Sequence, residues 1–208
     1  MKTVALIANG QIDSPEALRP SILKNQRIVA VDGGLRHCHE MGITPRLIVG
    51  DFDSCPENLL KHYASISQIV LPIDKDQTDL EVAIEHELKQ GAEAITFFAA
   101  WGKRADHSLT NALLLVRHVG KVKLETEEET LFAIRGKTEI QCHKGQTLSL
   151  IPLYGKATGI NTSGLKWELN KGTLDQNFIG ISNVCLKDQV VISIDHGSLL
   201  CCLLKQLY

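Results

Sequence analysis

The chain has 208 residues, of which 44% are hydrophobic and 22% charged, a composition typical of a globular protein with one domain or two small ones. Its 22 basic and 24 acidic residues give a formal net charge of −2, which argues against binding to nucleic acid or to an anionic membrane surface. No apolar run approaches the ~20 residues that a membrane-spanning helix requires. The six cysteines include no Cys-x-x-Cys pair, and the N-terminal apolar run is short enough for a first strand rather than a signal peptide. We therefore expect reduced thiols in a cytoplasmic protein.

Short β-branched runs alternate with segments of helical spacing over the first 125 residues. The expected strands are Val4–Ala8, Ile28–Val31, Leu47–Val49, Ile69–Leu71, Ile95–Ala99 and Val122–Leu124. Apolar residues recur with helical spacing over 80–88 and 109–116. Thr78 and Glu81 match a capping box before the first of these helices, and Gly91 stands where that helix is expected to end. This alternation predicts an α/β domain with a doubly wound, mostly parallel sheet.

The pattern changes after about residue 128, where short apolar runs are separated by glycines and no helical period remains. These runs are Thr138–Cys142, Thr147–Leu153, Leu165–Leu169, Val190–Ile194 and Leu199–Leu204. Regular turn signals between short strands are typical of a small β-sandwich or barrel. We therefore expect an α/β domain over residues 1–128 and an all-β sandwich domain over residues 129–208.

Polar and small residues follow five of the expected strands. They are Asn9-Gly10, Asp32-Gly33-Gly34, Gly50-Asp51-Phe52-Asp53-Ser54, the segment 72–79 and the segment 101–107. Ligands of open α/β sheets bind beyond the carboxyl ends of the strands, so these residues are expected to share one rim. Carboxylates gathered on one rim repel each other, and a divalent cation would relieve that repulsion.

Asp51 and Asp53 are two residues apart, so on an extended segment both would point the same way, with Phe52 turned towards the core. Such a pair suits a hard cation with oxygen ligands, such as Mg²⁺, although an Asx-turn with exposed acids has the same sequence. A second acidic cluster comprises Asp74, Asp76 and Asp79, and acids at a helix N-terminus are also explained by the helix dipole.

The segment Arg104-Ala105-Asp106-His107 opens the second expected helix. A guanidinium there can bind phosphate oxygens in a bidentate manner, whereas Asp106 can also be a simple N-cap. Acids for a metal, an arginine for phosphate and glycines for access are what phosphoryl transfer requires. The chain has no P-loop motif, and no Gly-x-Gly-x-x-Gly follows the first strand, which argues against a dinucleotide-dependent dehydrogenase.

Trp167 lies within an alternating run that we interpret as a strand. It would share a side of that strand with Leu165 and Leu169, which favours core packing, and stacking on a flat aromatic ligand is the functional alternative. Ser182 and Asn183 follow Gly180 and offer hydrogen-bonding groups in an expected loop.

Together these residues resemble the thiamine pyrophosphokinase family over almost the whole chain. The motifs that carry the resemblance are Asp32-Gly33-Gly34, Gly50-Asp51-Phe52-Asp53-Ser54, Asp74-Lys75-Asp76-Gln77-Thr78-Asp79, Arg104-Ala105-Asp106-His107 with Asn111, Gly164-Leu165-Lys166-Trp167 and Ser182-Asn183. The resemblance implies transfer of a pyrophosphoryl group from ATP to the hydroxyethyl group of thiamine, with release of AMP. It also implies an α/β catalytic domain followed by a β-sandwich domain, in a homodimer that holds thiamine between the two subunits.

The resemblance further implies roles for individual residues. It places Mg²⁺ ligands at Asp51, Asp53 and Asp79, with Asp76 and Arg104 also contributing to catalysis. The residues implied for ATP binding are Asp32, Gly33, Ser54, Thr78, Arg104, Asp106, His107 and Asn111. The residues implied for thiamine binding are Lys75, Trp167, Ser182 and Asn183, with Trp167 stacking on the pyrimidine.

One motif departs from the family, which usually has Gly-Gly-Arg where this chain has Gly102-Lys103-Arg104. Lys103 therefore brings a bulky side chain to a place where the backbone normally passes close to the nucleotide. Two other functions are compatible with parts of the pattern: a pyrophosphokinase for another heterocyclic alcohol, such as a hydroxymethylpterin, and a non-catalytic thiamine-binding protein. A non-catalytic protein would be expected to lose the acidic cluster, and here every acid is present.

Overall fold

The computed structural model describes residues 2–207, so the outermost residue of each expected domain lies outside the described part. The chain forms two compact units. The first comprises residues up to Leu109 together with Leu124–Glu127, and the second comprises Thr110–Lys123 and the residues from Glu128 onward. Helix α5 (Ala105–Arg117) and strand β6 (Val122–Glu125) each contribute residues to both units.

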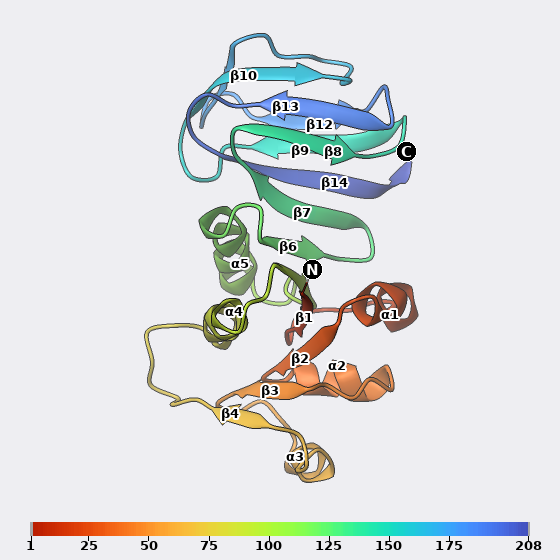
Figure 1. Cartoon of the computed structure of the whole chain (residues 1–208), viewed down its shortest axis with the longest axis vertical. Coiled ribbons are helices and arrows are strands. Elements are labelled where there is room, and N and C mark those ends of the chain that lie inside the picture. Colours follow the sequence, from red (N-terminus) through yellow and green to blue (C-terminus); the bar gives the residue numbers. More distant parts are fainter. Residues whose placement is uncertain (1, 208) are drawn as a thin grey trace. The chain divides into compact units, whose positions relative to one another are not determined.

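The first unit contains a parallel sheet with the strand order β4-β3-β2-β1-β5. Figure 1 labels the first four of these strands. The strands of the sheet are β1 (Thr3–Ile7), β2 (Arg27–Val31), β3 (Leu47–Gly50), β4 (Gln68–Val70) and β5 (Ala94–Phe98). Every neighbouring pair in this order is parallel, so the carboxyl ends of all five strands meet at one edge. This arrangement confirms the α/β class with a mostly parallel sheet.

Helices cover both faces of this sheet, as a doubly wound fold requires. They are α1 (Pro15–Leu23), α2 (Gly34–Glu40), α3 (Glu57–His62) and α4 (Asp79–Lys89). Helices α1, α2 and α3 share one apolar core with β1, β2 and β3, whereas α4 contacts the same three strands with residues that lie outside that core. No helix among residues 2–207 is long and apolar enough to cross a membrane.

Helix α4 begins and ends where the sequence predicts. Thr78 accepts a hydrogen bond from the backbone N–H of Glu81, and the Glu81 carboxylate accepts one from the backbone N–H of Thr78, which completes the capping box. The helix ends at Lys89, and Gly91 follows with φ +83°, the left-handed conformation that stops many helices. This cap fixes Asp79 as the first residue of α4.

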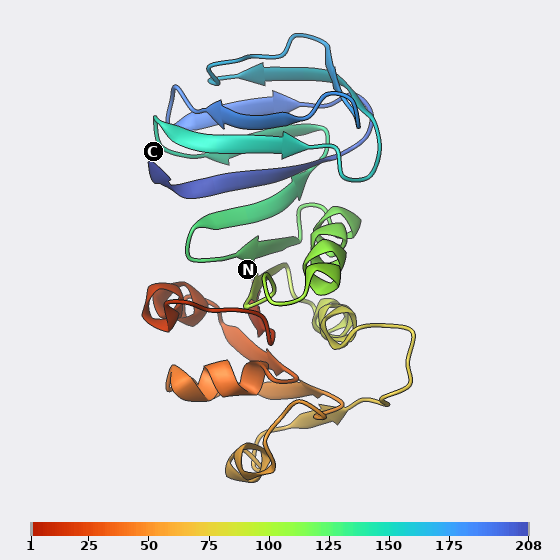
Figure 2. The same cartoon turned by 180° about the vertical axis from the view of Figure 1, so that it is seen from behind.

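The second unit is a β-sandwich made of two antiparallel sheets (Figure 2). Strands β12-β9-β14-β7 are hydrogen-bonded neighbours in that order, and β11-β10-β13-β8 form a separate four-stranded sheet. The strands are β7 (Glu129–Ile134), β8 (Lys137–Gln141), β9 (Gln146–Ile151), β10 (Ala157–Ser163), β11 (Gly172–Leu174), β12 (Gly180–Val184), β13 (Gln189–Ser193) and β14 (Leu199–Leu207). Buried residues from both sheets form one core, which confirms the predicted sandwich.

Two expectations for this unit are wrong. The segment Leu165–Leu169 is not a strand: it forms only an isolated bridge between Leu165 and Cys185, although Leu165 is buried as alternation suggested. Ser182 and Asn183 do not lie in a loop but in β12, where a bulge interrupts the pairing with β9 and Ser182 has φ +57°. The strands β7, β10, β11 and β12 were not expected. Polar residues and glycines hide the alternation in β10, β11 and β12, whereas β7 is a mainly apolar run that could have been recognised.

Candidate active site

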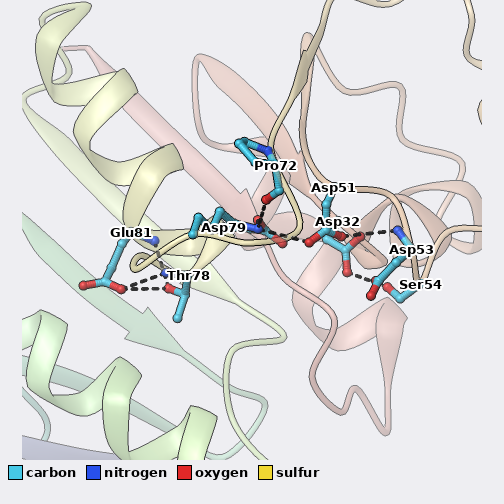
Figure 3. Close-up of polar contacts among 9 residues, drawn as sticks. Asp32, Asp51, Asp53, Ser54, Pro72, Thr78, Asp79 and Glu81 are labelled. Atoms are coloured by element: carbon cyan, nitrogen blue, oxygen red, sulfur yellow. Dashed lines mark hydrogen bonds and ion pairs between the residues drawn. The ribbon is translucent and has the colours of Figure 1, made fainter.

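Three carboxylates converge at the carboxyl edge of the parallel sheet. Asp32 directly follows β2, Asp51 directly follows β3, and Asp79 is the first residue of α4 (Figure 3). One carboxylate oxygen from each lies within 4.8 Å of the other two. The β2 and β3 strands are parallel neighbours, with Val31 paired to Val49, so the residues that follow them leave the sheet side by side.

Gly50 allows the ends of β2 and β3 to come this close. A Cβ on Gly50 would lie 3.0 Å from the Cα of Asp32, which is closer than real Cβ atoms normally approach a backbone atom. The backbone N–H of Asp32 also donates a hydrogen bond to Val49 O at 2.8 Å, which holds the two strand ends together. A side chain at position 50 would therefore push the two strand ends apart by a few tenths of an ångström.

The donor set suits a hard divalent cation. Carboxylate oxygens are the ligands that Mg²⁺ prefers, and Asp32 Oδ1 is buried with no hydrogen-bond partner within the described part of the chain. A buried carboxylate oxygen left unpaired is costly, and a bound cation would satisfy it. Burial raises the pKa of Asp79, whereas the hydrogen bond from Lys75 lowers the pKa of Asp51.

The structure does not bring Asp53 into this cluster. Phe52 packs against the core as expected, but its φ of +64° turns the chain, so Asp51 and Asp53 do not lie on one extended segment. Asp53 is exposed, its backbone N–H donates to Asp51 Oδ1 at 3.3 Å, and the charge of Asp51 raises the pKa of Asp53. Asp32, expected on the ATP side, takes the third position instead.

A polar network extends the cluster along the rim. The hydroxyl of Ser54 donates to Asp32 Oδ2 at 2.5 Å and accepts a hydrogen bond from Asn9 Nδ2 at 3.2 Å. Asn9 Oδ1 in turn accepts from Arg36 at 2.8 Å, and Gly33 lies against the Asn9 side chain. Asn9 and Arg36 were not among the predicted site residues. The position of Asn9 directly after the first strand was the available signal.

Lys75 and Asp76 lie on the segment before α4. Lys75 pairs with Asp51 and Asp79 at 3.0 Å each, so it belongs to the carboxylate cluster in this structure, although the resemblance implies a place beside thiamine. Asp76 is exposed on the same segment.

Arg104 and Asp106 form a bidentate ion pair at the start of α5. The guanidinium donates to Asp106 at 3.1 and 2.6 Å, and these hydrogen bonds lower the pKa of Asp106 to about 2. Since α5 begins at Ala105, Asp106 lies inside the first turn and is not its N-cap. His107 is exposed on the same turn, and Asn111 is buried one turn further along.

In the second unit, Trp167 is exposed rather than packed in the core. Its side chain is 57% exposed, and Lys166 Nζ lies 4.6 Å from the ring centroid. Asn183 accepts a hydrogen bond from the backbone N–H of Trp167 at 3.1 Å and donates one to its carbonyl at 2.7 Å. This pair of bonds fixes the Trp167 backbone to β12 and leaves the indole open to solvent. The backbone N–H of Ser182 donates to Ser149 Oγ at 3.0 Å.

Two family models match the chain in succession. Residues 19–126 match the thiamin pyrophosphokinase catalytic domain, and residues 134–199 match the thiamin pyrophosphokinase vitamin B1 binding domain. The chain belongs to the thiamine pyrophosphokinase family. A thiamine pyrophosphokinase from Bacillus subtilis is 28% identical over 204 residues, covering 93% of this chain and 92% of the relative.

Solved structures of thiamine pyrophosphokinases have the same fold. The crystal structure of the Bacillus subtilis protein has a TM-score of 0.87 at 25% identity and covers 99% of this chain and 100% of its own. The thiamin pyrophosphokinase from Geobacillus thermodenitrificans has a TM-score of 0.88 at 24% identity, covering 98% of each chain.

The departure from the thiamine pyrophosphokinase motif at Lys103 also has a structural account. Lys103 has φ +59°, the left-handed conformation that glycine adopts readily, so the backbone keeps a glycine-like shape despite the side chain. The ammonium of Lys103 turns to Asn9 O at 3.1 Å. The lysine therefore folds back along the rim.

Proposed function

We propose that this chain is a Mg²⁺-dependent thiamine pyrophosphokinase, which transfers a pyrophosphoryl group from ATP to the hydroxyethyl group of thiamine and releases AMP. The observation that carries the proposal is the convergence of Asp32, Asp51 and Asp79 at the carboxyl edge of the sheet, in a chain of this family. We further propose that it acts in the cytoplasm as a homodimer, with thiamine held between subunits.

The three converging carboxylates are the residues that would hold the metal, with Asp53 beside them. When bound, Mg²⁺ would neutralise charge on the phosphate oxygens and so favour attack at phosphorus. Ser54 and Asn9 keep Asp32 oriented towards the site through their hydrogen bonds.

Arg104 supplies the positive charge for the nucleotide. Its guanidinium is exposed and forms a bidentate pair with the carboxylate of Asp106. Two oxygens of a phosphate group can accept the same pair of hydrogen bonds. When a phosphate group replaces Asp106 as the partner of Arg104, the guanidinium can offset negative charge on the AMP leaving group or on the transferred pyrophosphoryl group. Gly33, Thr78, His107 and Asn111 complete the proposed ATP side.

The alcohol of thiamine must lose its proton during attack. We propose a carboxylate of the same rim as the acceptor, and the candidates are Asp76, which is exposed, and Asp79, which is partly buried. On the thiamine side, the open indole of Trp167 offers a stacking surface for an aromatic ring, and the Asn183 hydrogen bonds keep it in place.

One assay separates this proposal from its alternatives. Protein incubated with ATP, Mg²⁺ and thiamine should yield equal amounts of AMP and thiamine diphosphate, and neither should form with EDTA. A pyrophosphokinase for another alcohol would form AMP only with a hydroxymethylpterin or similar acceptor. A thiamine-binding protein without catalytic activity would bind thiamine and form no AMP.

A further inference from the structure

Lys75 lies between two of the three converging carboxylates. Its Nζ donates hydrogen bonds to Asp51 Oδ2 at 3.0 Å and to Pro72 O at 2.9 Å, and it forms an ion pair with Asp79 Oδ1 at 3.0 Å. Two carboxylates and one backbone carbonyl therefore surround the ammonium of Lys75. The Lys75, Asp51 and Asp79 side chains are only 12–18% exposed, so water and salt screen these ion pairs in part only.

The same carboxylates form the proposed metal site. Asp51 and Asp79 supply two of the three oxygens that lie within 4.8 Å of one another. Mg²⁺ binds carboxylate oxygens at about 2.0–2.1 Å. The positive charge of the Lys75 ammonium on the same carboxylates would repel the cation. The lysine contacts and metal binding therefore compete for Asp51 and Asp79.

We propose that Lys75 is the resident counter-ion of the metal site: it neutralises Asp51 and Asp79 while no metal is bound, and the metal displaces it. This inference rests on the proposed function, because that function places a metal at these carboxylates. Lys75 is a positioning residue in this role. It keeps the carboxylates together without metal, and it lowers the affinity for the metal because its own contacts must first be broken.

The first test measures Mn²⁺ binding without nucleotide, by electron paramagnetic resonance, in the wild type and in Lys75→Met. Removal of the competing ammonium should tighten Mn²⁺ binding by roughly tenfold or more, given the strength of hydrogen bonds between charged groups. Lys61→Met is the matched control. It makes the same substitution and charge change, but the Lys61–Glu57 pair at 2.7 Å is exposed on α3. Its Mn²⁺ affinity should equal that of the wild type.

A second measurement uses thermal unfolding of the same proteins. In EDTA, Lys75→Met should melt below the wild type, because Asp51 and Asp79 then repel each other without a counter-ion. Added Mg²⁺ should raise its melting temperature more than it raises that of the wild type. A purely structural role for Lys75 predicts a lower melting temperature both with and without Mg²⁺, and no gain in metal affinity.

A third measurement follows Lys75 in the wild-type protein by NMR. In wild-type protein labelled with [¹⁵N]lysine, the Nζ signal of Lys75, assigned by comparison with Lys75→Arg, should shift on addition of Mg²⁺, and that of Lys61 should not. An unchanged Lys75 signal at saturating Mg²⁺, or unchanged or weaker Mn²⁺ binding in Lys75→Met, overturns the displacement. If either of these results is obtained while the wild type still binds metal and forms thiamine diphosphate, the role of Lys75 is wrong and the proposed function stands. Absence of metal binding in every protein overturns the metal site as well.

Discussion

Asp32 and Asp53 are rival third carboxylates for the candidate metal site. The sequence motif favours Asp53, since it lies two residues from Asp51, whereas the structure brings Asp32 within reach and leaves Asp53 exposed. The difference arises from the left-handed conformation of Phe52, which turns Asp53 away, and from the parallel pairing of β2 with β3. Neither feature is visible in a spacing of two residues.

We predict that Asp32→Asn weakens Mn²⁺ binding by about tenfold or more, because it removes a ligand charge and keeps the size of the side chain. Asp53→Asn is the matched control, with the same change on a neighbouring exposed residue, and should weaken binding less. Asp51→Asn should nearly abolish formation of thiamine diphosphate with the fold intact by circular dichroism. A larger effect from Asp53→Asn than from Asp32→Asn would return Asp53 to the third position.

Arg104 controls the titration of Asp106. Because the folded-state pKa of Asp106 is lowered to about 2, the pair stabilises the folded protein above the unfolded pKa of about 3.9, and this contribution is lost as the pH falls towards 2. We predict that Arg104→Gln raises the pKa of Asp106 towards its ordinary value, measured by NMR titration of its carboxyl carbon. Lys103→Gln, one residue away, should leave it low. A pKa that stays near 2 in Arg104→Gln would mean that another group holds the carboxylate.

At the scale of elements, the best predicted part of the fold is the start of α4. The capping box at Thr78 and Glu81 is written in local sequence, so it could be recognised without knowing the tertiary structure. Strands β1, β2, β3 and β5 were equally accessible, since a largely buried parallel strand is a continuous apolar run. Strand β4 is exposed at Gln68 and Val70, and only its short apolar run indicated it. The run Leu165–Leu169 misled because Leu165 and Leu169 pack on the core from an irregular segment, which alternation alone cannot distinguish from a strand.

Loss of the Thr78 cap should destabilise α4 and loosen the position of the Asp79 carboxylate at its start. We predict that Thr78→Ala lowers the free energy of unfolding by about 1 kcal/mol, because the backbone N–H of Glu81 loses its acceptor. Gln77→Ala is the control: it removes an exposed neighbouring side chain whose hydrogen bond is to Glu85. Urea unfolding of both variants measures the difference. Equal stabilities would show that the cap contributes nothing in the folded protein.

The irregular segment that carries Trp167 gives a prediction of a different kind. Because the indole is 57% exposed, Trp167→Phe should change the free energy of unfolding by no more than ~0.5 kcal/mol. It should still raise the thiamine KM, with the ATP KM near normal, since stacking contributes on the order of 1 kcal/mol. Tyr154→Phe, at another exposed aromatic residue of the same unit, is the control. A sharp fall in melting temperature with unchanged thiamine affinity would contradict a stacking role.

At the scale of the whole molecule, the sequence predicts two different units because strand patterns differ before and after residue 128. The compact units are defined instead by contacts in space, which assign residues 110–123 to the second unit although they belong to the α/β pattern. Contacts between distant segments are not encoded in local periodicity, so this feature could not be predicted. The same holds for the contact between Lys75 and Asp51, which directly follows β3, whereas Asp79 lies only four residues from Lys75, at the start of α4.

Active sites shared between the two subunits of the proposed homodimer lead to a prediction about mixtures of variants. If each active site combines the metal site of one subunit with the thiamine site of the other, Asp51→Asn and Trp167→Ala damage different halves of every site. At low thiamine, Asp51→Asn alone should be nearly inactive, and Trp167→Ala alone should lose roughly fivefold in activity, since stacking contributes on the order of 1 kcal/mol. After subunit exchange at equal amounts, half of the dimers are mixed, and each mixed dimer contains one site with both halves intact. Activity should then recover to about a quarter of the wild-type value in a two-fold symmetric dimer.

The control mixture combines Asp51→Asn with Asp79→Asn. Both substitutions damage the metal half, so no arrangement of subunits restores an intact site and the mixture should stay inactive. A monomer in sedimentation velocity, or a dimer that exchanges subunits without any recovery in the first mixture, would contradict sites shared between subunits. In that case each chain would have to bind ATP and thiamine by itself.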